Sequence, residues 1–333
     1  MNRQKIFLRG IVPKKLTGIR LDQTLAKLFP NYSRSQLQNW IRAGYVYVNG
    51  TKKTLVRETV QNNQSIEIIA YRLNQDRKRQ VFAQELPLNV LYEDESLLII
   101  DKPPGLTVHP GAGIPDCTLI DTLLHRNPQM AALPRSGIVH RLDKDTSGLL
   151  VIARSLTSYH LLIKAIQTRK IVREYEAIVK GTPISGQTIR APIGRHPVNR
   201  TRMSVVSDGG REATTHFRIL QRYKAHTHVR IRLETGRTHQ IRVHMNYIRH
   251  PLIGDQVYGG RLSAPSNLSD TLRATLQAFR RQALHATTLK FSHPLTQKIM
   301  EWHSPLPQDI LNLLESLSKN DIYASKRKNT SNE

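Results

Sequence analysis

The chain has 333 residues and a formal net charge of +25, from 50 lysines and arginines against 25 aspartates and glutamates. Its apolar fraction of 39% is that of a folded globular protein and excludes a wholly disordered chain. The basic excess favours a polyanionic partner, because lysine and arginine neutralise phosphates and release their counterions. The only cysteine, Cys117, excludes a disulfide within the chain and a zinc site built on cysteines.

The sequence contains no strongly apolar run approaching 18 residues, which a membrane-spanning helix would need. Its first ten residues, MNRQKIFLRG, lack the apolar core of a signal peptide. We therefore expect a cytoplasmic protein that does not enter a membrane.

Residues 16–70 predict a small module of two helices followed by strands. Leucines recur at helical spacing in RLDQTLAKLF, and a second apolar face follows in SRSQLQNWIRAG. YVYVNGTKK predicts a strand that ends in an Asn49-Gly50 turn, and SIEIIA predicts another strand. This order of elements resembles the S4-like RNA-binding domain, in which basic side chains on the helices contact RNA phosphates.

Five basic residues of this module lie off its apolar stripe: Arg20, Arg34, Arg42, Lys52 and Lys53. Each of them, taken alone, is equally well explained as part of a solvated surface. The resemblance to the S4-like domain implies that they bind RNA.

The remaining chain divides into three parts. Residues 71–85 are polar and lack periodicity, which predicts a linker, and residues 318–333 predict a disordered tail. Between them, residues 86–317 alternate predicted strands with predicted helices, such as REYEAIVKG and TSYHLLIKAIQTRK. This alternation favours an α+β domain with a mixed, largely antiparallel sheet flanked by helices.

The segment HRLDKDTSGLL places two carboxylates among basic residues. With an unperturbed pKa of about 3.9, both Asp143 and Asp145 should be ionised at neutral pH. An ionised carboxylate is a poor general acid but a good nucleophile or base. Asp145, followed by Thr-Ser-Gly, is better explained as a turn residue. The spacing alone does not decide between a turn and a catalytic role for Asp143.

Several motifs in the expected order resemble the RluA-type family of pseudouridine synthases. GIVHRLDKDTSGLLVIA resembles the family signature, whose catalytic aspartate is here Asp143. REYEAIV carries the family's active-site tyrosine at Tyr175, and ETGRTHQIRVHM carries an arginine at Arg237. DKPPGLTVHPG, LIGDQVYGG and QALHATTLKFSHP also match family patterns.

The resemblance implies the pseudouridine synthase fold and isomerisation of uridine to pseudouridine in RNA. It implies that Asp143 acts on C1′ or deprotonates the ribose, and that Tyr175 stacks on the uracil or transfers a proton. From the residues alone, Tyr175 would be a core residue of a strand. We expect Arg237, just before a predicted helix N-cap at Thr238, to pair with Asp143.

Arg141 is expected to hold the flipped nucleotide or its phosphate, and His140 to support the loop or approach phosphate. The reaction needs no cofactor. The 14 histidines show no arrangement that indicates a metal site, and none is expected.

Within the family, the S4-like module and the VHPGAG stretch resemble members that act on large-subunit (23S) ribosomal RNA, the expected partner of a monomeric enzyme. Two alternatives stay open. One is a uridine isomerase of the same fold for transfer RNA or another ribosomal site. The other is a non-catalytic RNA-binding factor for ribosome assembly.

Overall fold

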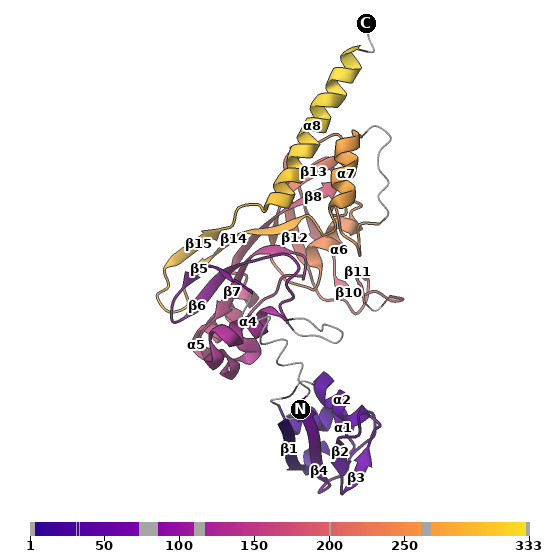
Figure 1. Ribbon diagram of the computed structural model, residues 1–333, viewed down its shortest axis with the longest axis vertical. Helices are drawn as coiled ribbons and strands as arrows, with labels where there is room; N and C mark the ends of the chain where they lie inside the picture. Colours follow the sequence, from indigo (N-terminus) through magenta and orange to yellow (C-terminus); the bar gives the residue numbers. More distant parts are fainter. Residues whose placement is uncertain are drawn as a thin grey trace. The chain divides into compact units, whose positions relative to one another are not determined.

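The computed structural model describes residues 4–30, 32, 34–72, 86–109, 117–199, 201–260 and 268–330. The described residues up to 72 form one compact unit, and those from 86 onwards, apart from the masked gaps, form another (Figure 1). In the described part of the chain, no helix is both long and apolar enough to cross a bilayer.

The N-terminal unit is a four-stranded antiparallel sheet with two helices. The strand order is β1-β4-β2-β3. Its elements are β1 (Gln4–Ile11), η1 (Lys14–Leu16), α1 (Leu21–Leu28), α2 (Arg34–Arg42), β2 (Val46–Val48), β3 (Thr51–Lys53) and β4 (Ser65–Arg72). The leucines predicted to form the helix faces are buried against the sheet, as Leu25 and Leu37 show. The predicted turn is present, with both Asn49 and Gly50 at positive φ.

The boundaries of this unit differ from those predicted. β1 lies before residue 16 and pairs with β4 along its whole length, so the unit begins earlier than expected. The alternation of apolar and polar residues does not predict this strand, because Phe7 and Ile11 on its outer face are apolar although each is more than half exposed. β4 runs to Arg72, inside the predicted linker, and the rest of that linker, 73–85, lies outside the described residues.

The larger unit contains a nine-stranded mixed sheet of order β5-β6-β7-β14-β8-β13-β12-β9, with β15 also paired to β14. Its strands are β5 (Asn89–Glu93), β6 (Leu97–Lys102), β7 (Ser147–Ala153), β8 (Val172–Lys180), β9 (Gln187–Arg190), β12 (Thr214–Arg222), β13 (His226–Leu233), β14 (Leu284–Ser292) and β15 (Ile299–His303). Among the described strands of this sheet, β7 and β14 form the one parallel pair. A separate ribbon joins β10 (Ile193–Arg195) to β11 (Met203–Val205). The predicted α+β class with a largely antiparallel sheet is confirmed.

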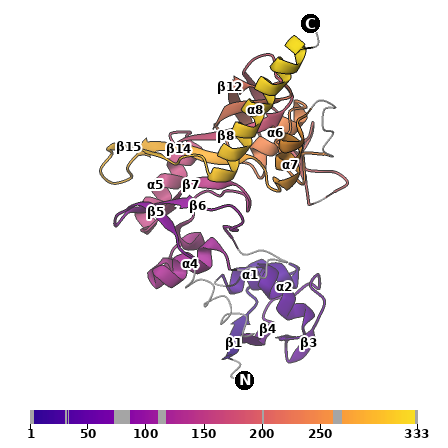
Figure 2. The ribbon, with the colours of Figure 1, turned by 45° about the horizontal axis from the view of Figure 1, so that its top comes forward.

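Helices flank this sheet. They are α4 (Leu119–Arg126), η2 (Pro128–Ala132), η3 (Pro134–Gly137), α5 (Leu156–Gln167), α6 (Gln240–Tyr247), α7 (Asp270–Ala278) and α8 (Gln308–Thr330). In both ribbon views α7 and α8 lie side by side (Figures 1 and 2). α8 continues to Thr330 through the segment predicted to be a disordered tail, and Leu317 and Asn320 on it are buried.

Gly148 allows β14 to approach the start of β7. Its φ is +110°, and a Cβ there would lie 2.3 Å from the carbonyl oxygen of Ala286. Ala286 is its partner in the parallel β7–β14 register. Gly148, three residues after Asp145, therefore lets β14 pair with β7 at the point where the chain leaves the HRLD segment.

We predict that Gly148→Ala lowers the free energy of unfolding by about 3 kcal/mol, because it adds backbone strain to a steric clash with another strand. Urea denaturation measures the change. Gly209→Ala is the matched control, since Gly209 also has positive φ but nothing within 4 Å of its Cβ position. It should cost only about 1 kcal/mol, and equal losses in the two variants would contradict the role of the β7–β14 contact.

Candidate active site

Asp143 lies in a turn that enters the most buried strand of the sheet. The amide of Thr146 donates to the carbonyl oxygen of Asp143 (3.1 Å), and every residue of β7 is buried. Leu142 is also buried, whereas the Asp143 side chain keeps 16% of its surface exposed. The backbone is thus held on both sides of a carboxylate that stays accessible. Asp145, predicted to shape the turn, accepts a hydrogen bond at its carbonyl oxygen from Arg281 (3.3 Å).

Arg242 on α6 binds Asp143 and a second carboxylate at the same time. Its Nη1 donates to Oδ2 of Asp143 (3.0 Å), while its Nε and Nη2 donate to the two carboxylate oxygens of Asp255 (2.7 and 2.9 Å). Burial alone lowers the pKa of Arg242, but the two carboxylates outweigh it and raise the pKa above its usual value. Arg242 therefore stays charged, and its ion pair with Asp143 orients that carboxylate.

Asp255 is itself fixed by its own loop. It is fully buried, and its Oδ1 accepts hydrogen bonds from the amides of Val257 and Tyr258 (both 2.9 Å). Burial raises the pKa of Asp255, but the bonds from Arg242 and these amides outweigh it and hold the pKa below its usual value. A buried carboxylate that carries this many donors is ionised at neutral pH.

Tyr258 and His239 complete the surroundings of Arg242. The Arg242 guanidinium carbon lies 5.0 Å from the centre of the Tyr258 ring, within cation–π range. The Tyr258 hydroxyl is 2.8 Å from Nδ1 of His239, whose Nε2 lies 3.9 Å from Oδ1 of Asp143. Burial lowers the pKa of His239 despite the nearby Asp143 carboxylate.

The predicted pairing of Arg237 with Asp143 is wrong. Nε of Arg237 donates to the carbonyl oxygen of Glu212 (2.9 Å), and α6 begins only at Gln240, so Thr238 is not its N-cap. The later start turns Arg242, five residues further along the same motif, towards Asp143. Arg237 still lines the pocket described below. The RTHQIR motif contains both arginines, and the sequence did not distinguish them.

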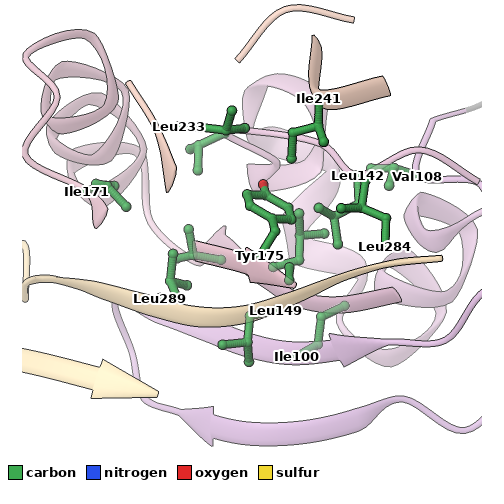
Figure 3. Close-up of a cluster of buried hydrophobic side chains, with 14 of the residues drawn as sticks. Ile100, Val108, Leu142, Leu149, Ile171, Tyr175, Leu233, Ile241, Leu284 and Leu289 are labelled. Carbon is green, nitrogen blue, oxygen red and sulfur yellow. The ribbon is translucent and has the colours of Figure 1, made fainter. Parts of the chain in front are cut away.

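Tyr175 on β8 is both a core residue and a pocket residue. It is 5% exposed, and its ring is surrounded by apolar side chains such as Leu142 and Leu289 (Figure 3). The hydroxyl points between Leu233 and Ile241, and no described residue forms a hydrogen bond with it. Burial is the main cause that raises its pKa, so the hydroxyl stays protonated at neutral pH.

A pocket of about 570 Å³ brings these segments together. Besides Asp143 and Tyr175, it is lined by residues of the HRLD and ETGRTHQIR segments and by the end of α5. Its seven arginines outnumber its three carboxylates: Arg135, Arg141, Arg169, Arg173, Arg211, Arg237 and Arg242 against Asp143, Glu212 and Glu234. A cavity with this excess of positive charge suits an anionic ligand.

The two basic residues of the HRLD segment differ in role. Arg141 is exposed at the pocket wall. His140 accepts a hydrogen bond at Nε2 from the amide of Val151 (3.2 Å), which ties the segment to β7. Burial lowers the pKa of His140 to about 3, so it is neutral and carries no charge to attract phosphate. Of its two predicted roles, the geometry favours support of the loop.

In the N-terminal unit, a buried carboxylate holds two of the five predicted RNA-binding residues. Asp22 is fully buried and accepts hydrogen bonds from Arg20 (3.0 Å), Arg34 (2.6 Å) and Gln38 (2.7 Å). These bonds outweigh the effect of burial and lower its pKa. Both arginine side chains remain more than one third exposed, so their cationic heads are fixed at the surface.

The other three predicted residues are less constrained. Arg42 donates to the side chain of Asn39 (3.1 Å), and Lys52 is exposed. Lys53 forms an ion pair with Glu58, which offsets its charge. Within the described ranges, no group of three or more His, Cys, Asp or Glu side chains is placed to hold a metal ion.

We predict that Asp255→Asn lowers the free energy of unfolding by about 3 kcal/mol at neutral pH, because it leaves Arg242 buried with a weaker partner. The folded pKa of Asp255 lies below its unfolded value, so its contribution is complete above about pH 4 and disappears as the pH falls through the folded pKa. Chemical denaturation from pH 3 to 8 should show a difference from wild type that is constant above pH 5 and shrinks below pH 4. Asp270→Asn, which changes a fully exposed carboxylate, should have a much smaller effect at neutral pH, and a pH-independent loss in Asp255→Asn would argue against the ion pair.

Comparison with known proteins agrees with this arrangement. A family model described as RNA pseudouridylate synthase matches residues 96–247, and an S4 domain model matches residues 19–66. Among solved structures, Human RNA Pseudouridylate Synthase Domain Containing 4 is 26% identical, with a TM-score of 0.56 over 73% of this chain and 97% of that one.

Curated relatives match nearly the whole length. The ribosomal large subunit pseudouridine synthases D of Salmonella typhimurium and Pasteurella multocida are 48% and 50% identical to this chain, each over 94% of it and 95% of the relative. The protein of that name from Escherichia coli is 47% identical over 94% of both chains. The chain therefore belongs to the RNA pseudouridylate synthase family, and it is an isomerase with an N-terminal S4 domain.

Proposed function

We propose that this enzyme converts specific uridines of large-subunit (23S) ribosomal RNA to pseudouridine, with Asp143 as the catalytic residue. The observation that supports this substrate is the similarity along 94% of the chain to relatives named as ribosomal large subunit pseudouridine synthase D. A charged substrate of this kind also fits the net charge of +25 and the arginine-lined pocket.

The reaction is an isomerisation and leaves the composition of the nucleotide unchanged. The N1–C1′ bond breaks, the uracil turns within the pocket, and C5 forms a new bond to C1′. C5 then loses its proton, and N1 carries one in the product. No electrons are exchanged with a second substrate, so the chemistry calls for no cofactor.

In this proposal Asp143 acts on the ribose, either as the nucleophile at C1′ or as the base that removes a ribose proton. Either role needs a carboxylate within reach of the sugar, and the ion pair with Arg242 orients the Asp143 carboxylate for it. The target base must leave its stack to reach Asp143, at a cost of a few kcal/mol. Tyr175, with its protonated hydroxyl and ring edge at the pocket, is positioned to contact the flipped uracil.

The remaining basic residues serve RNA binding in this proposal. Arg141 at the pocket wall holds the flipped nucleotide or its phosphate. The S4 domain contributes Arg20 and Arg34, fixed by Asp22, together with Arg42 and Lys52. Lys53 contributes least, because Glu58 already neutralises it. We further propose that the enzyme works as a monomer in the cytoplasm, where ribosomal RNA is made in bacteria such as those of its relatives.

A per-position pseudouridine map of cellular RNA tests the function. In a strain that lacks this gene, specific pseudouridines should disappear from 23S RNA, and the wild-type gene should restore them. The Asp143→Asn allele should not restore them, because an amide neither attacks C1′ nor takes a proton; we expect its rate of pseudouridine formation to be less than about one thousandth of the wild-type rate. Full restoration by Asp143→Asn would overturn the catalytic assignment, and losses confined to transfer RNA would overturn the substrate.

A double variant of the S4 domain tests the RNA-binding surface. Arg42→Gln with Lys52→Gln should weaken binding to a 23S RNA fragment and reduce the slope of log K against log salt by roughly 1.5, because each phosphate contact contributes about 0.7–0.9. The control, Arg9→Gln with Arg57→Gln, removes two exposed charges of the same domain that are outside the predicted set. Equal effects of the two pairs would contradict a defined surface.

A further inference from the structure

Arg173 is a buried arginine in the pocket to which no role has been assigned so far. It lies on β8 two residues before Tyr175, so both side chains are on the same face of the sheet. Arg173 is only 5% exposed, and it lines the same pocket as Asp143. The guanidinium passes beneath the ETG loop, where a Cβ at Gly236 would lie 3.0 Å from its Nη1.

This guanidinium has no counter-ion among the described residues. Within the described residues, no carboxylate lies within 4 Å of it, and its Nε is buried without a hydrogen-bond partner. Its one hydrogen bond is a long contact of 3.5 Å from Nη2 to the carbonyl oxygen of Glu234. The carboxylate of Glu234 instead pairs with Arg169 and His216.

A buried charge without a partner is costly, and proteins seldom keep one unless something binds it. Arg230 on the neighbouring strand also has a buried Nε without a partner, but it differs from Arg173 in having a carboxylate to pair with. Arg230 donates to the carboxylate of Glu176 (2.8 Å) and does not line the pocket. Arg173 thus has the properties of a binding group whose partner is the substrate.

The neighbours of Arg173 indicate which part of the substrate that is. Arg173 and Tyr175 are each only 5% exposed and line the pocket together with Asp143, so these two side chains form its buried, deep end. The backbone of an RNA strand remains at the mouth, near exposed Arg141, because only the flipped nucleotide enters. The deep end therefore receives the base.

We infer that Arg173 binds a carbonyl oxygen of the flipped uracil and stabilises the negative charge that the ring carries while it is detached. When the N1–C1′ bond breaks, its electron pair stays on the uracil and spreads over N1 and the two carbonyl oxygens. The pair is then used for the bond from C5 to C1′, and the C5 proton leaves to solvent. Arg173 holds the charge between these two events.

This inference rests on the proposed uridine isomerisation, and its test separates the two. The substrate is a 23S RNA fragment with tritium at C5 of uridine, which is released when C5 joins C1′. Wild-type enzyme that releases no tritium from any such fragment would count against the proposed substrate. Once release is found, Arg173→Met should lower its single-turnover rate about a hundredfold, with the dissociation constant for RNA changed less than about threefold.

Two further variants make this result specific. Arg173→Lys keeps the charge and should recover part of the rate, whereas Arg230→Met should stay within about threefold of wild type. Because Arg173→Met removes an unpaired buried charge, its melting temperature should be unchanged or higher. A fall in melting temperature with no recovery by lysine would indicate a structural role and overturn the inference.

Substrate analogues identify the atom that Arg173 contacts. In a synthetic oligonucleotide, the target is replaced by 2-thiouridine or 4-thiouridine, since sulfur is a weaker acceptor than oxygen. One of the two substitutions should slow wild type but add little to the loss in Arg173→Met, as expected for two changes to one contact. If only a neutral methylphosphonate next to the target shows this non-additivity, Arg173 binds the backbone, and the uracil assignment fails.

Discussion

The bifurcated ion pair of Arg242 is the contact on which the rest of the site depends. One guanidinium joins the turn before β7, through Asp143, to the loop after α6, through Asp255. These segments are far apart in sequence, and only the completed sheet brings them together. Asp255 is fully buried and held by two amides, so it orients Arg242, and Arg242 in turn orients the more accessible Asp143. The buried carboxylate of Asp255 and the accessible carboxylate of Asp143 thus bind the same guanidinium.

The S4 domain uses the same physical device for a different purpose. Asp22, fully buried, orients two arginines whose cationic heads remain at the surface. In both units a buried, ionised carboxylate costs desolvation energy and recovers it through several charged hydrogen bonds. In the catalytic unit the oriented arginine faces inward to another carboxylate, whereas in the S4 domain the arginines face solvent. The arginine of the catalytic unit therefore binds a second carboxylate, whereas the arginines of the S4 domain are accessible to a partner in solution.

The sequence predicted the architecture wherever the apolar pattern was strong. The fully buried β7, the alternating β13 and the leucine faces of α1 and α2 follow from periodicity alone. β1 was missed because its exposed face also carries apolar residues, Phe7 and Ile11, and the end of α8 was missed because its last turns are polar. Asp143 and Tyr175 came from motif resemblance, and the structure places both at one pocket.

Arg242 shows why the site could not be completed from the sequence. The RTHQIR segment offers two arginines, and which one meets Asp143 depends on where α6 begins. Thr238 is a good N-cap by type, but the chain takes a left-handed conformation at His239 and the helix starts at Gln240. A shift of one residue rotates a helix by about 100°. The local preference for a threonine cap was outweighed by tertiary contacts of His239 with Tyr258 and of Gln240 with Thr215.

The two buried arginines of the pocket, Arg242 and Arg173, have different electrostatic roles because their partners differ. Arg242 is saturated by two carboxylates, so its charge is already balanced before RNA arrives, and it orients Asp143. No carboxylate of the described residues lies within 4 Å of Arg173, and we infer that the substrate balances its charge. A group that interacts more strongly with the detached uracil than with the intact nucleotide accelerates the reaction, whereas one that binds both equally does not. Among these two arginines, only the unpaired one meets that condition.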